Sequence, residues 1–207
     1  GVLAIVIIGI LGIPASSFIA VLSAAGLTIG LAFQGSLSNF AGGVLILLFK
    51  PFKIGDFVKE YVHGNEGLVE GIDLFYTRMR TFDNKIVIIP NGSLANTSIT
   101  NYTANNKRRI EIKVGISYDS DMKRAKDILM NVINSQDGIL KNEDNKVYVD
   151  ALEESQITIG TMAWVMTDDY WKIKWELTEK FKNALDDAGI EIPFNQLSVT
   201  INEKQRK

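Results

Sequence analysis

The stretch IAVLSAAGLTIGLAFQGSLSNFAGGVLILLFKPFKIGD, residues 19–56, decides the fold of this chain. It belongs to a longer N-terminal segment, because residues 1–49 contain no Asp, Glu, Lys, Arg or His. Every charged side chain of the 207-residue chain lies from Lys50 onward, and together they give a net charge of −2. A long uncharged run followed by a mixed sequence is typical of a membrane segment joined to a water-soluble part. We therefore expect one chain in two environments.

The uncharged segment is predicted to contain two helical pieces. Residues 1–13 are continuously apolar but shorter than the ~20 residues that span a bilayer, so we interpret them as the end of a longer transmembrane helix. Pro14 disfavours helix in the residue before it, and residues 14–49 form the second predicted helix. Its one polar stretch, QGSLSN at 34–39, pairs Gly with Ser, where helices often bend. We predict a kink near Gly35, with a spanning half before it and an interfacial half after it.

One face of the spanning half consists mostly of small residues around two leucines. Leu27 and Leu31 lie one helical turn apart at the centre of this face. Small side chains let helix backbones approach closely in lipid. We therefore predict a ring of identical helices in which both leucines form an apolar gate that excludes ions by dewetting. The residues predicted to pack the ring are Ala20, Ser23, Ala24, Gly26, Thr28 and Gly30. From these residues alone, ordinary packing between two helices is the alternative.

Two lysines follow the apolar segment directly. Lys50 and Lys53 flank Pro51, which ends the predicted helix. Basic residues beside a membrane span mark its cytoplasmic side, and they attract anionic headgroups. We predict that both lysines lie at the membrane interface.

The rest of the chain is predicted to form two soluble domains. Residues 50–103 hold short β-rich runs separated by turn residues, which indicates an all-β domain. Residues 104–194 alternate in the order β-α-β-β-α, which is typical of a ferredoxin-like α+β sandwich. Its helices are predicted at 122–135, after an Asp119-Ser120-Asp121 cap, and at 171–189, ending at Gly189. Residues 195–207 are predicted to form a short strand, 197–202, and a charged tail.

Composition and motifs give no support to an enzyme. The chain has no Cys and one His, His63, so neither a thiolate metal site nor a Ser-His-Asp arrangement is expected within one subunit. We predict no catalytic residue, cofactor or metal, and the mild acidity gives no reason to expect nucleic acid as a partner. The three Trp residues, Trp164, Trp171 and Trp175, are expected to pack the C-terminal domain. The Pro90-Asn91-Gly92 segment is predicted to be a turn, with a signalling role at a domain interface as the alternative.

Several segments resemble one bacterial family, the small-conductance mechanosensitive channels (MscS). Residues 19–56 resemble the pore-helix signature of that family, and RMRTFDNKIVIIPNGSLANTSITNY, residues 78–102, resembles its β-domain signature. VGISYDSD, residues 114–121, and DAGIEIPFNQLSVTI, residues 187–201, are similar to its C-terminal domain. The resemblance implies a homoheptamer with two transmembrane helices upstream of this chain. It also implies an Sm-like β domain and an α+β domain around a vestibule, and a final strand in a β-barrel.

The resemblance assigns roles within the pore helix. It implies that Leu27 and Leu31 are the gate and that Gly35 is the kink. Ser23 and Thr28 depart from the family pattern, which has Gly and Ala at these places. Both are bulkier, and their hydroxyls are expected to bond back to the helix.

The expected function is a weakly selective, tension-gated ion channel that releases ions and small osmolytes on hypo-osmotic shock. Its expected partners are further copies of itself, membrane lipid and the permeating solutes. The expected location is the bacterial inner membrane, with the C-terminal domains in the cytoplasm. A secondary transporter and a membrane-anchored Sm-like binding module are the alternatives. The transporter would need a polar site within the membrane, and the binding module would need a basic or aromatic surface.

Overall fold

The computed structural model of the chain describes residues 15–197. The predicted end of a transmembrane helix at 1–13, and the predicted final strand beyond Leu197, therefore lie outside the described residues. The chain divides into two compact units, one up to Ala104 and one from Asn105 onward, and each is described by itself.

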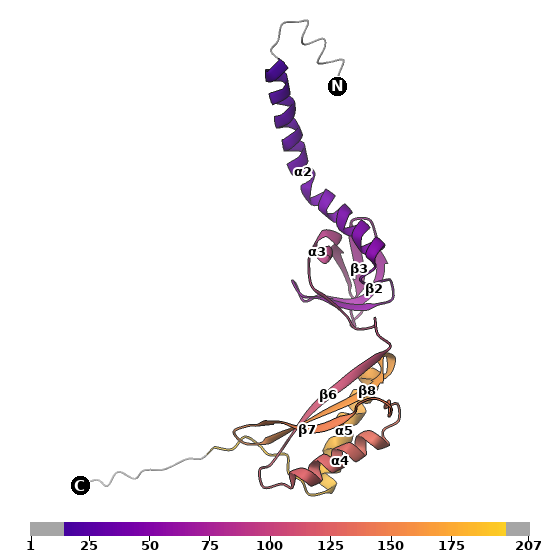
Figure 1. Cartoon of the computed structure of the whole chain (residues 1–207), viewed down its shortest axis with the longest axis vertical. Coiled ribbons are helices and arrows are strands. Elements are labelled where there is room, and N and C mark those ends of the chain that lie inside the picture. Colours follow the sequence, from indigo (N-terminus) through magenta and orange to yellow (C-terminus); the bar gives the residue numbers. More distant parts are fainter. Residues whose placement is uncertain (1–14, 198–207) are drawn as a thin grey trace, which may run out of the picture. The chain divides into compact units, whose positions relative to one another are not determined.

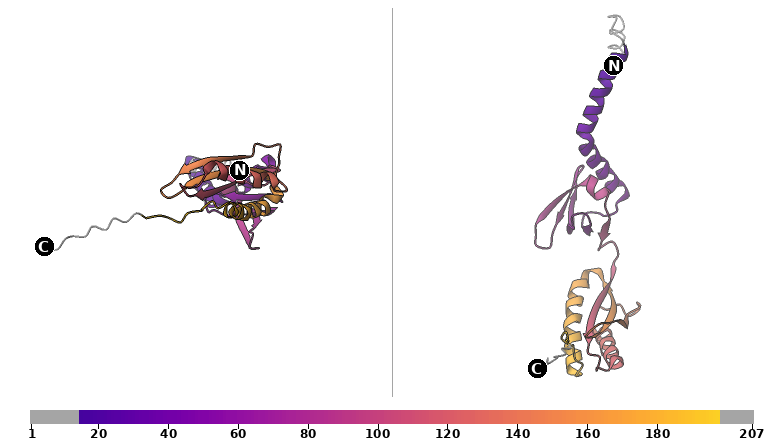
Figure 2. Two further views of the ribbon diagram at one scale, coloured as in Figure 1. Left: turned by 90° about the horizontal axis from the view of Figure 1, so that it is seen from below. Right: turned by 90° about the vertical axis from the view of Figure 1, so that its left-hand side faces the viewer.

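The first unit begins with a long helix, α2 (Ala15–Phe49), which has 35 residues. At 1.5 Å per residue it is about 52 Å long, which exceeds the ~30 Å hydrocarbon thickness of a bilayer. The stretch Ser16–Phe49 is long and apolar enough to cross a membrane. Figures 1 and 2 show that α2 changes direction partway along while remaining helical. The predicted two halves are thus parts of one bent helix, and the role of Gly35 in the bend stays a prediction.

A five-stranded antiparallel sheet follows α2 in the first unit. Its strands lie in the order β4-β3-β2-β1-β5, and a short helix, α3 (Asn91–Ala95), connects β4 to β5. Most runs predicted from the sequence are strands here, although the three-residue β5 has no clear signal of its own. The strands are β1 (Phe57–Glu60), β2 (Glu66–Ile72), β3 (Tyr76–Arg80), β4 (Ile86–Pro90) and β5 (Ile99–Asn101).

The core of the first unit includes a residue of α2. Ile46 from the helix is 2% exposed and belongs to the same buried cluster as the sheet residues. The other members are Phe52, Val58, Val69, Met79, Ile89 and Leu94. The last turns of α2 are therefore part of the β-sheet core, whereas the first turns are not.

The second unit has the predicted order β-α-β-β-α. Its elements are β6 (Lys107–Ile116), α4 (Met122–Ser135), β7 (Lys146–Leu152), β8 (Ile157–Met166), the 3-10 turn η1 (Thr167–Asp169) and α5 (Tyr170–Asp187). The antiparallel sheet has the order β6-β8-β7 (Figure 1). Ile110 and Ile116 of β6 are buried in one cluster with residues of both helices, whereas Arg109, Glu111 and Lys113 are exposed. The helices therefore cover one face of this sheet.

The predicted start of α4 is confirmed, whereas α5 ends at Asp187, two residues before the predicted Gly189. Asp121 caps α4, because its carboxylate Oδ1 accepts the Arg124 backbone N–H at 3.0 Å. Gly189 follows α5 with φ of +70°, and its N–H donates to the Asp186 carbonyl at 2.9 Å. A left-handed residue just past a helix is commonly Gly, because Gly has no Cβ to clash there.

Candidate pore-lining helix and its junction with the β sheet

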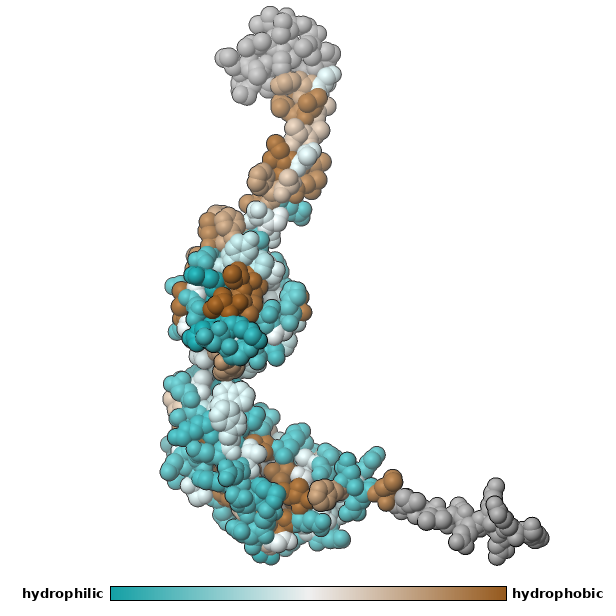
Figure 3. All heavy atoms as spheres, turned by 180° about the vertical axis from the view of Figure 1, so that it is seen from behind, coloured by the Kyte–Doolittle hydropathy of each residue, from teal (hydrophilic) through white to brown (hydrophobic). Residues whose placement is uncertain are grey.

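The first part of α2 is an apolar helix with few contacts to the rest of the described chain. Leu27 is 65% exposed and Leu31 is 62% exposed, and the side chains around them are exposed as well. Figure 3 shows apolar side chains along this helix, in contrast to the largely hydrophilic surface of the second unit. Water does not favour so large an apolar surface, so this part of α2 requires lipid or other protein around it.

Three glycines of this helix are not required by packing against any residue that the structure describes. A Cβ placed on Gly26, Gly30 or Gly35 would meet nothing within 4 Å. Gly in a helix interior costs about 1 kcal/mol relative to Ala, and no contact among residues 15–197 offsets that cost at these three positions. Close approach of another helix would offset it.

The predicted hydroxyl contact of Thr28 is present. Its Oγ1 donates to the Ala24 backbone carbonyl at 2.8 Å, one turn earlier in the helix. The polar atom of Thr28 is therefore satisfied within its own helix, which leaves its methyl group for packing.

The second part of α2 is fixed closely to α3 by two adjacent glycines. A Cβ on Gly42 would lie 2.6 Å from the Asn91 carbonyl oxygen, which is too close for any real contact. A Cβ on Gly43 would collide with the Leu74 carbonyl oxygen. On the facing side, a Cβ on Gly92 would lie 2.8 Å from Ser38 Oγ. The glycines on both sides let two backbones touch.

Asn91 is a buried polar centre of this junction, with 0% exposure. Its Oδ1 accepts the Thr77 hydroxyl at 2.8 Å, and its Nδ2 donates to the Asp73 carbonyl at 2.8 Å. Its backbone N–H donates to the Phe75 carbonyl at 2.9 Å. Each polar atom of the side chain thus has a partner, as burial demands.

One hydrogen bond links the two helices directly. The Gly92 backbone N–H donates to the Asn39 side-chain Oδ1 of α2 at 3.0 Å. Pro90 ends β4, and Asn91 and Gly92 begin α3, so the turn predicted for these three residues is wrong. Sequence reasoning also missed Asn39, Gly42 and Gly43, although two adjacent glycines within an apolar helix are a signal for close backbone packing.

Lys50 and Lys53 lie directly after α2, as the sequence predicted. Lys50 has a positive φ of 47°, and its N–H donates to the Ile46 carbonyl at 2.8 Å, so it ends the helix. Both side chains are exposed.

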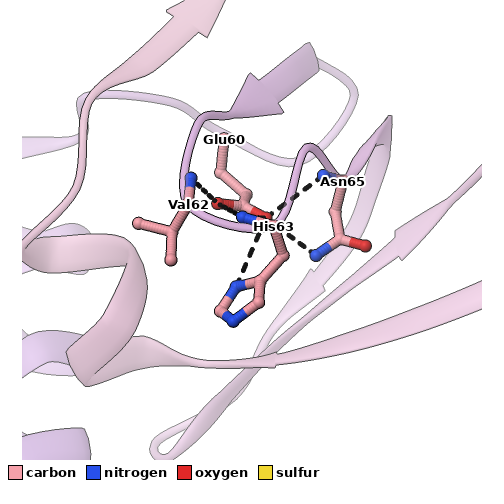
Figure 4. Close-up of polar contacts among 4 residues, drawn as sticks. All are labelled: Glu60, Val62, His63 and Asn65. Carbon is pink, nitrogen blue, oxygen red and sulfur yellow. Dashed lines mark hydrogen bonds and ion pairs between the residues drawn. The ribbon is translucent and has the colours of Figure 1, made fainter.

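The single histidine lies beside a buried carboxylate (Figure 4). Glu60 is 2% exposed, and its carboxylate accepts the backbone N–H groups of Val62, His63 and Asn65 at 2.7 to 3.1 Å. Asn65 Nδ2 donates a further bond at 2.8 Å, and His63 Nδ1 lies 3.7 Å from Oε1. Burial raises the pKa of Glu60, but the N–H donors together lower it by more than burial raises it. The pKa of Glu60 therefore lies below the ordinary value of 4.5. This cluster orders the turn after β1.

Other polar candidates form no site for a metal within residues 15–197. In that range, no group of three or more His, Cys, Asp or Glu side chains is arranged to hold a metal ion. Asp121 is a helix cap, as predicted, and Asp186 pairs with Lys182 in the same helix.

The expectation that all three Trp residues pack the C-terminal domain is wrong for two of them. Trp171 is 44% exposed and Trp175 is 66% exposed on α5. Their rings lie beside one another with centroids 6.0 Å apart. Trp164 is partly buried, with the Arg109 guanidinium 5.8 Å from its ring centre.

Comparisons with known proteins agree over nearly the whole chain. A family model described as "Mechanosensitive ion channel, beta-domain" matches residues 35–104. A second, "Mechanosensitive ion channel MscS, C-terminal", matches residues 110–192. An uncharacterised MscS family protein of Buchnera aphidicola subsp. Baizongia pistaciae is 42% identical over 197 residues, which cover 95% of this chain and 69% of that relative. A small-conductance mechanosensitive channel of Edwardsiella ictaluri is 42% identical over 176 residues, 85% of this chain and 61% of that channel.

Solved structures agree as well. The crystal structure of Helicobacter pylori MscS, described as a closed state, matches with a TM-score of 0.88 and 34% identity. The match covers 97% of this chain and 79% of that one. The chain of Arabidopsis thaliana MSL1 has the same fold, with a TM-score of 0.75 at 19% identity.

Proposed function

Because this chain belongs to the MscS family of mechanosensitive channels, we propose that it lines the pore of a channel that membrane tension opens. The channel passes ions and small osmolytes with weak selectivity and relieves hypo-osmotic shock. The observation that carries this proposal is the contrast within α2. Its first part exposes Leu27, Leu31 and contact-free glycines, whereas its second part is fixed to the β sheet.

The proposed pore is a ring of α2 helices from identical subunits. Gly26 and Gly30 allow the neighbouring helix to approach, and Ala20, Ser23, Ala24 and Thr28 form the rest of the packing surface. Leu27 and Leu31 then face the axis as two apolar rings, which water does not wet when the ring is narrow. Gly35 allows the bend that separates this pore part from the interfacial part.

Tension acts through area in this proposal. An expanded ring of helices occupies more membrane area than a narrow one, so stretched lipid shifts the population toward the expanded state. The described part of α2 carries no charged side chain at the constriction, and strong selection between anions and cations is therefore not expected there.

The proposed assembly is a homoheptamer in the bacterial inner membrane with both soluble units in the cytoplasm. The strand order of the first unit supports an Sm-like domain, residues 50–103. The β-α-β-β-α order of the second supports a ferredoxin-like domain, residues 104–194, with the final strand of the chain in a β-barrel. The proposed activity is transport, without catalysis and without a cofactor.

Substitutions at the leucines test the proposed gate in the complete channel protein. Leu27→Ser and Leu31→Ser should hydrate the constriction, so the channel should open at lower tension in patch recordings. Each Leu side chain has about 1.5–3 kcal/mol of hydrophobic free energy, multiplied around the ring, so the shift should be large. Leu22→Ser is the matched control, because Leu22 is 52% exposed on the opposite face of the helix and should leave the tension threshold nearly unchanged. Unchanged or higher thresholds for both pore variants would place the gate elsewhere.

A further inference from the structure

The turn that follows α2 has an internal support that its sequence does not suggest. We call residues 50–56 the post-helix turn. Phe52 lies in the core of the first unit with 2% exposure, between residues that are exposed. The turn is thus anchored in the sheet by one aromatic side chain.

Hydrogen bonds fix the rest of the post-helix turn. Asp56 is 5% exposed, and its Oδ2 accepts the Lys53 backbone N–H at 3.0 Å and Asn101 Nδ2 at 2.7 Å. The Gly55 N–H donates to the Val69 carbonyl at 2.9 Å, and the Asp56 N–H donates to the Lys53 carbonyl at 3.1 Å. A turn held by this many bonds presents its outward side chains in a fixed arrangement.

The outward side chains combine positive charge with apolar surface. Lys50 and Lys53 are exposed, and Ile54 is 61% exposed. Phe49, the last residue of α2, is 74% exposed. An isoleucine held outward by a fixed turn has no role in the core of its own unit.

The lysine charges are not used within the part of the chain that the structure describes. The ion pairs of the first unit involve Lys59, His63, Arg78, Arg80 and Lys85, and neither Lys50 nor Lys53 joins them. A neighbouring cavity is lined by Ile54, Glu70 and Arg78, among others. Its two charges are already paired, Arg78 with Asp73 at 3.3 Å and Glu70 with Arg80 at 2.5 Å. Positive charge available to an anion therefore lies at the lysines.

We propose that the post-helix turn is a docking surface for anionic phospholipid headgroups. Lys50 and Lys53 contact the phosphates, and Phe49 and Ile54 enter the adjoining acyl region. The proposal rests on the proposed function, because it takes α2 as a membrane helix. The uncharged stretch that ends at Phe49 fixes the partner as a lipid surface, since the chain passes from apolar to cationic within one residue. Lysines extend their ammonium groups to the headgroups while their stems stay in apolar surroundings.

A label at Ile54 tests this proposal. The described chain has no Cys, so Ile54→Cys in an otherwise Cys-free complete channel takes one fluorophore at one place. In vesicles of phosphatidylcholine with phosphatidylglycerol, lipids that carry a doxyl quencher should quench this label. Ile88→Cys is the matched control, with 60% exposure on β4 of the same unit, and it should remain unquenched.

Charge dependence identifies the headgroup contact. Quenching should be stronger with phosphatidylglycerol than with phosphatidylcholine alone, and salt should weaken the difference. Each lysine near an anionic surface raises the binding constant for that surface about fivefold. The double variant Lys50→Gln, Lys53→Gln should therefore lose most of the difference in quenching between the two lipids. Lys85→Gln is the control, because Lys85 is exposed and already paired with Asp83.

Three results would overturn the proposal. The first is an unquenched, water-exposed label at 54 in all vesicles. The second is an unquenched label with a blue-shifted spectrum, which would mean that protein covers the turn. The third is quenching that is equal in both lipids and insensitive to the lysines. Tension-gated currents recorded from the same vesicles separate this proposal from the proposed function, since currents with an unquenched label contradict the docking surface alone.

Discussion

The glycines of α2 are needed for two different physical reasons, which depend on what surrounds each one. A Cβ on Gly42 or Gly43 would collide with atoms of the same chain, whereas a Cβ on Gly26 or Gly30 would meet nothing within 4 Å among residues 15–197. The fold of the first unit explains the first pair, and close approach of another helix in the proposed ring would explain the second pair.

The prediction for Gly42→Ala is a less stable first unit. The added Cβ would lie 2.6 Å from the Asn91 carbonyl, and relieving such an overlap costs about 1–3 kcal/mol. In a chain of this size each kcal/mol lowers the unfolding midpoint by about 2–4 °C. Thermal unfolding of the detergent-solubilised protein by circular dichroism measures it. An unfolding midpoint equal to that of the parent would show that α2 and α3 separate without cost.

Glu60 gives the first unit a specific pH dependence. Because its folded pKa lies below the ordinary value of 4.5, its carboxylate stabilises the fold above about that pH. This stability is lost as the pH falls through the folded pKa. Glu60→Gln should cost roughly 2 kcal/mol at pH 7, since the amide offers an N–H toward donors, and the cost should shrink in acid.

The control for Glu60 is Glu66→Gln. Glu66 is 44% exposed and pairs with Lys59 at 3.6 Å, so its loss should cost less than ~1 kcal/mol. Unfolding midpoints measured from pH 7 down to about pH 3 compare the two variants. A constant difference between the parent and Glu60→Gln across this range would contradict the role assigned to the carboxylate.

At the scale of elements, the junction of α2 with α3 couples the membrane helix to the sheet. The bond from the Gly92 N–H to Asn39 Oδ1 is its direct polar link. Asn39→Ala should speed hydrogen exchange of the Gly92 amide by roughly tenfold, as the loss of one bond of about 1–1.5 kcal/mol implies. Exchange followed by mass spectrometry measures this, with Ser36→Ala as the control because Ser36 is exposed on α2. Equal protection in both variants would mean that another contact holds the junction.

Sequence predicted the regular elements better than the contacts between them. Helix α4 has the predicted bounds, 122–135, because a capping Asp121 precedes an amphipathic pattern. The three-residue strand β5 has no such periodicity and depends on pairing with β1. The contacts of Asn39 with Gly92 and of Gly42 with Asn91 join residues about 50 positions apart in the chain, and local patterns do not encode such contacts.

The Trp residues show a second limit of sequence reasoning. Trp171 and Trp175 do not pack the C-terminal domain as expected, because their positions on α5 place them on the solvent side. The buried face of that helix is formed by Tyr170, Ile173, Leu177, Phe181 and Leu185. Large aromatic residues outside the buried face of a helix therefore lie on the surface of the domain and not in its core.

In the molecule as a whole, α2 has two structurally different parts. Its second part is fixed to the β sheet by close backbone contact, so it moves with that unit. Its first part has an apolar surface that the described chain leaves exposed, and the proposed ring provides its neighbours. In the proposed channel, opening would be a movement of the first part relative to the second, at the bend within α2 (Figure 1).

A structure of the assembled channel, viewed along its axis in lipid, is the most direct measurement. We expect a ring of seven copies around one central hole, with the smallest radius at Leu27 and Leu31 and with Gly26 and Gly30 against the next helix. A ring whose two leucines face lipid, or a particle without a central hole, would contradict this expectation.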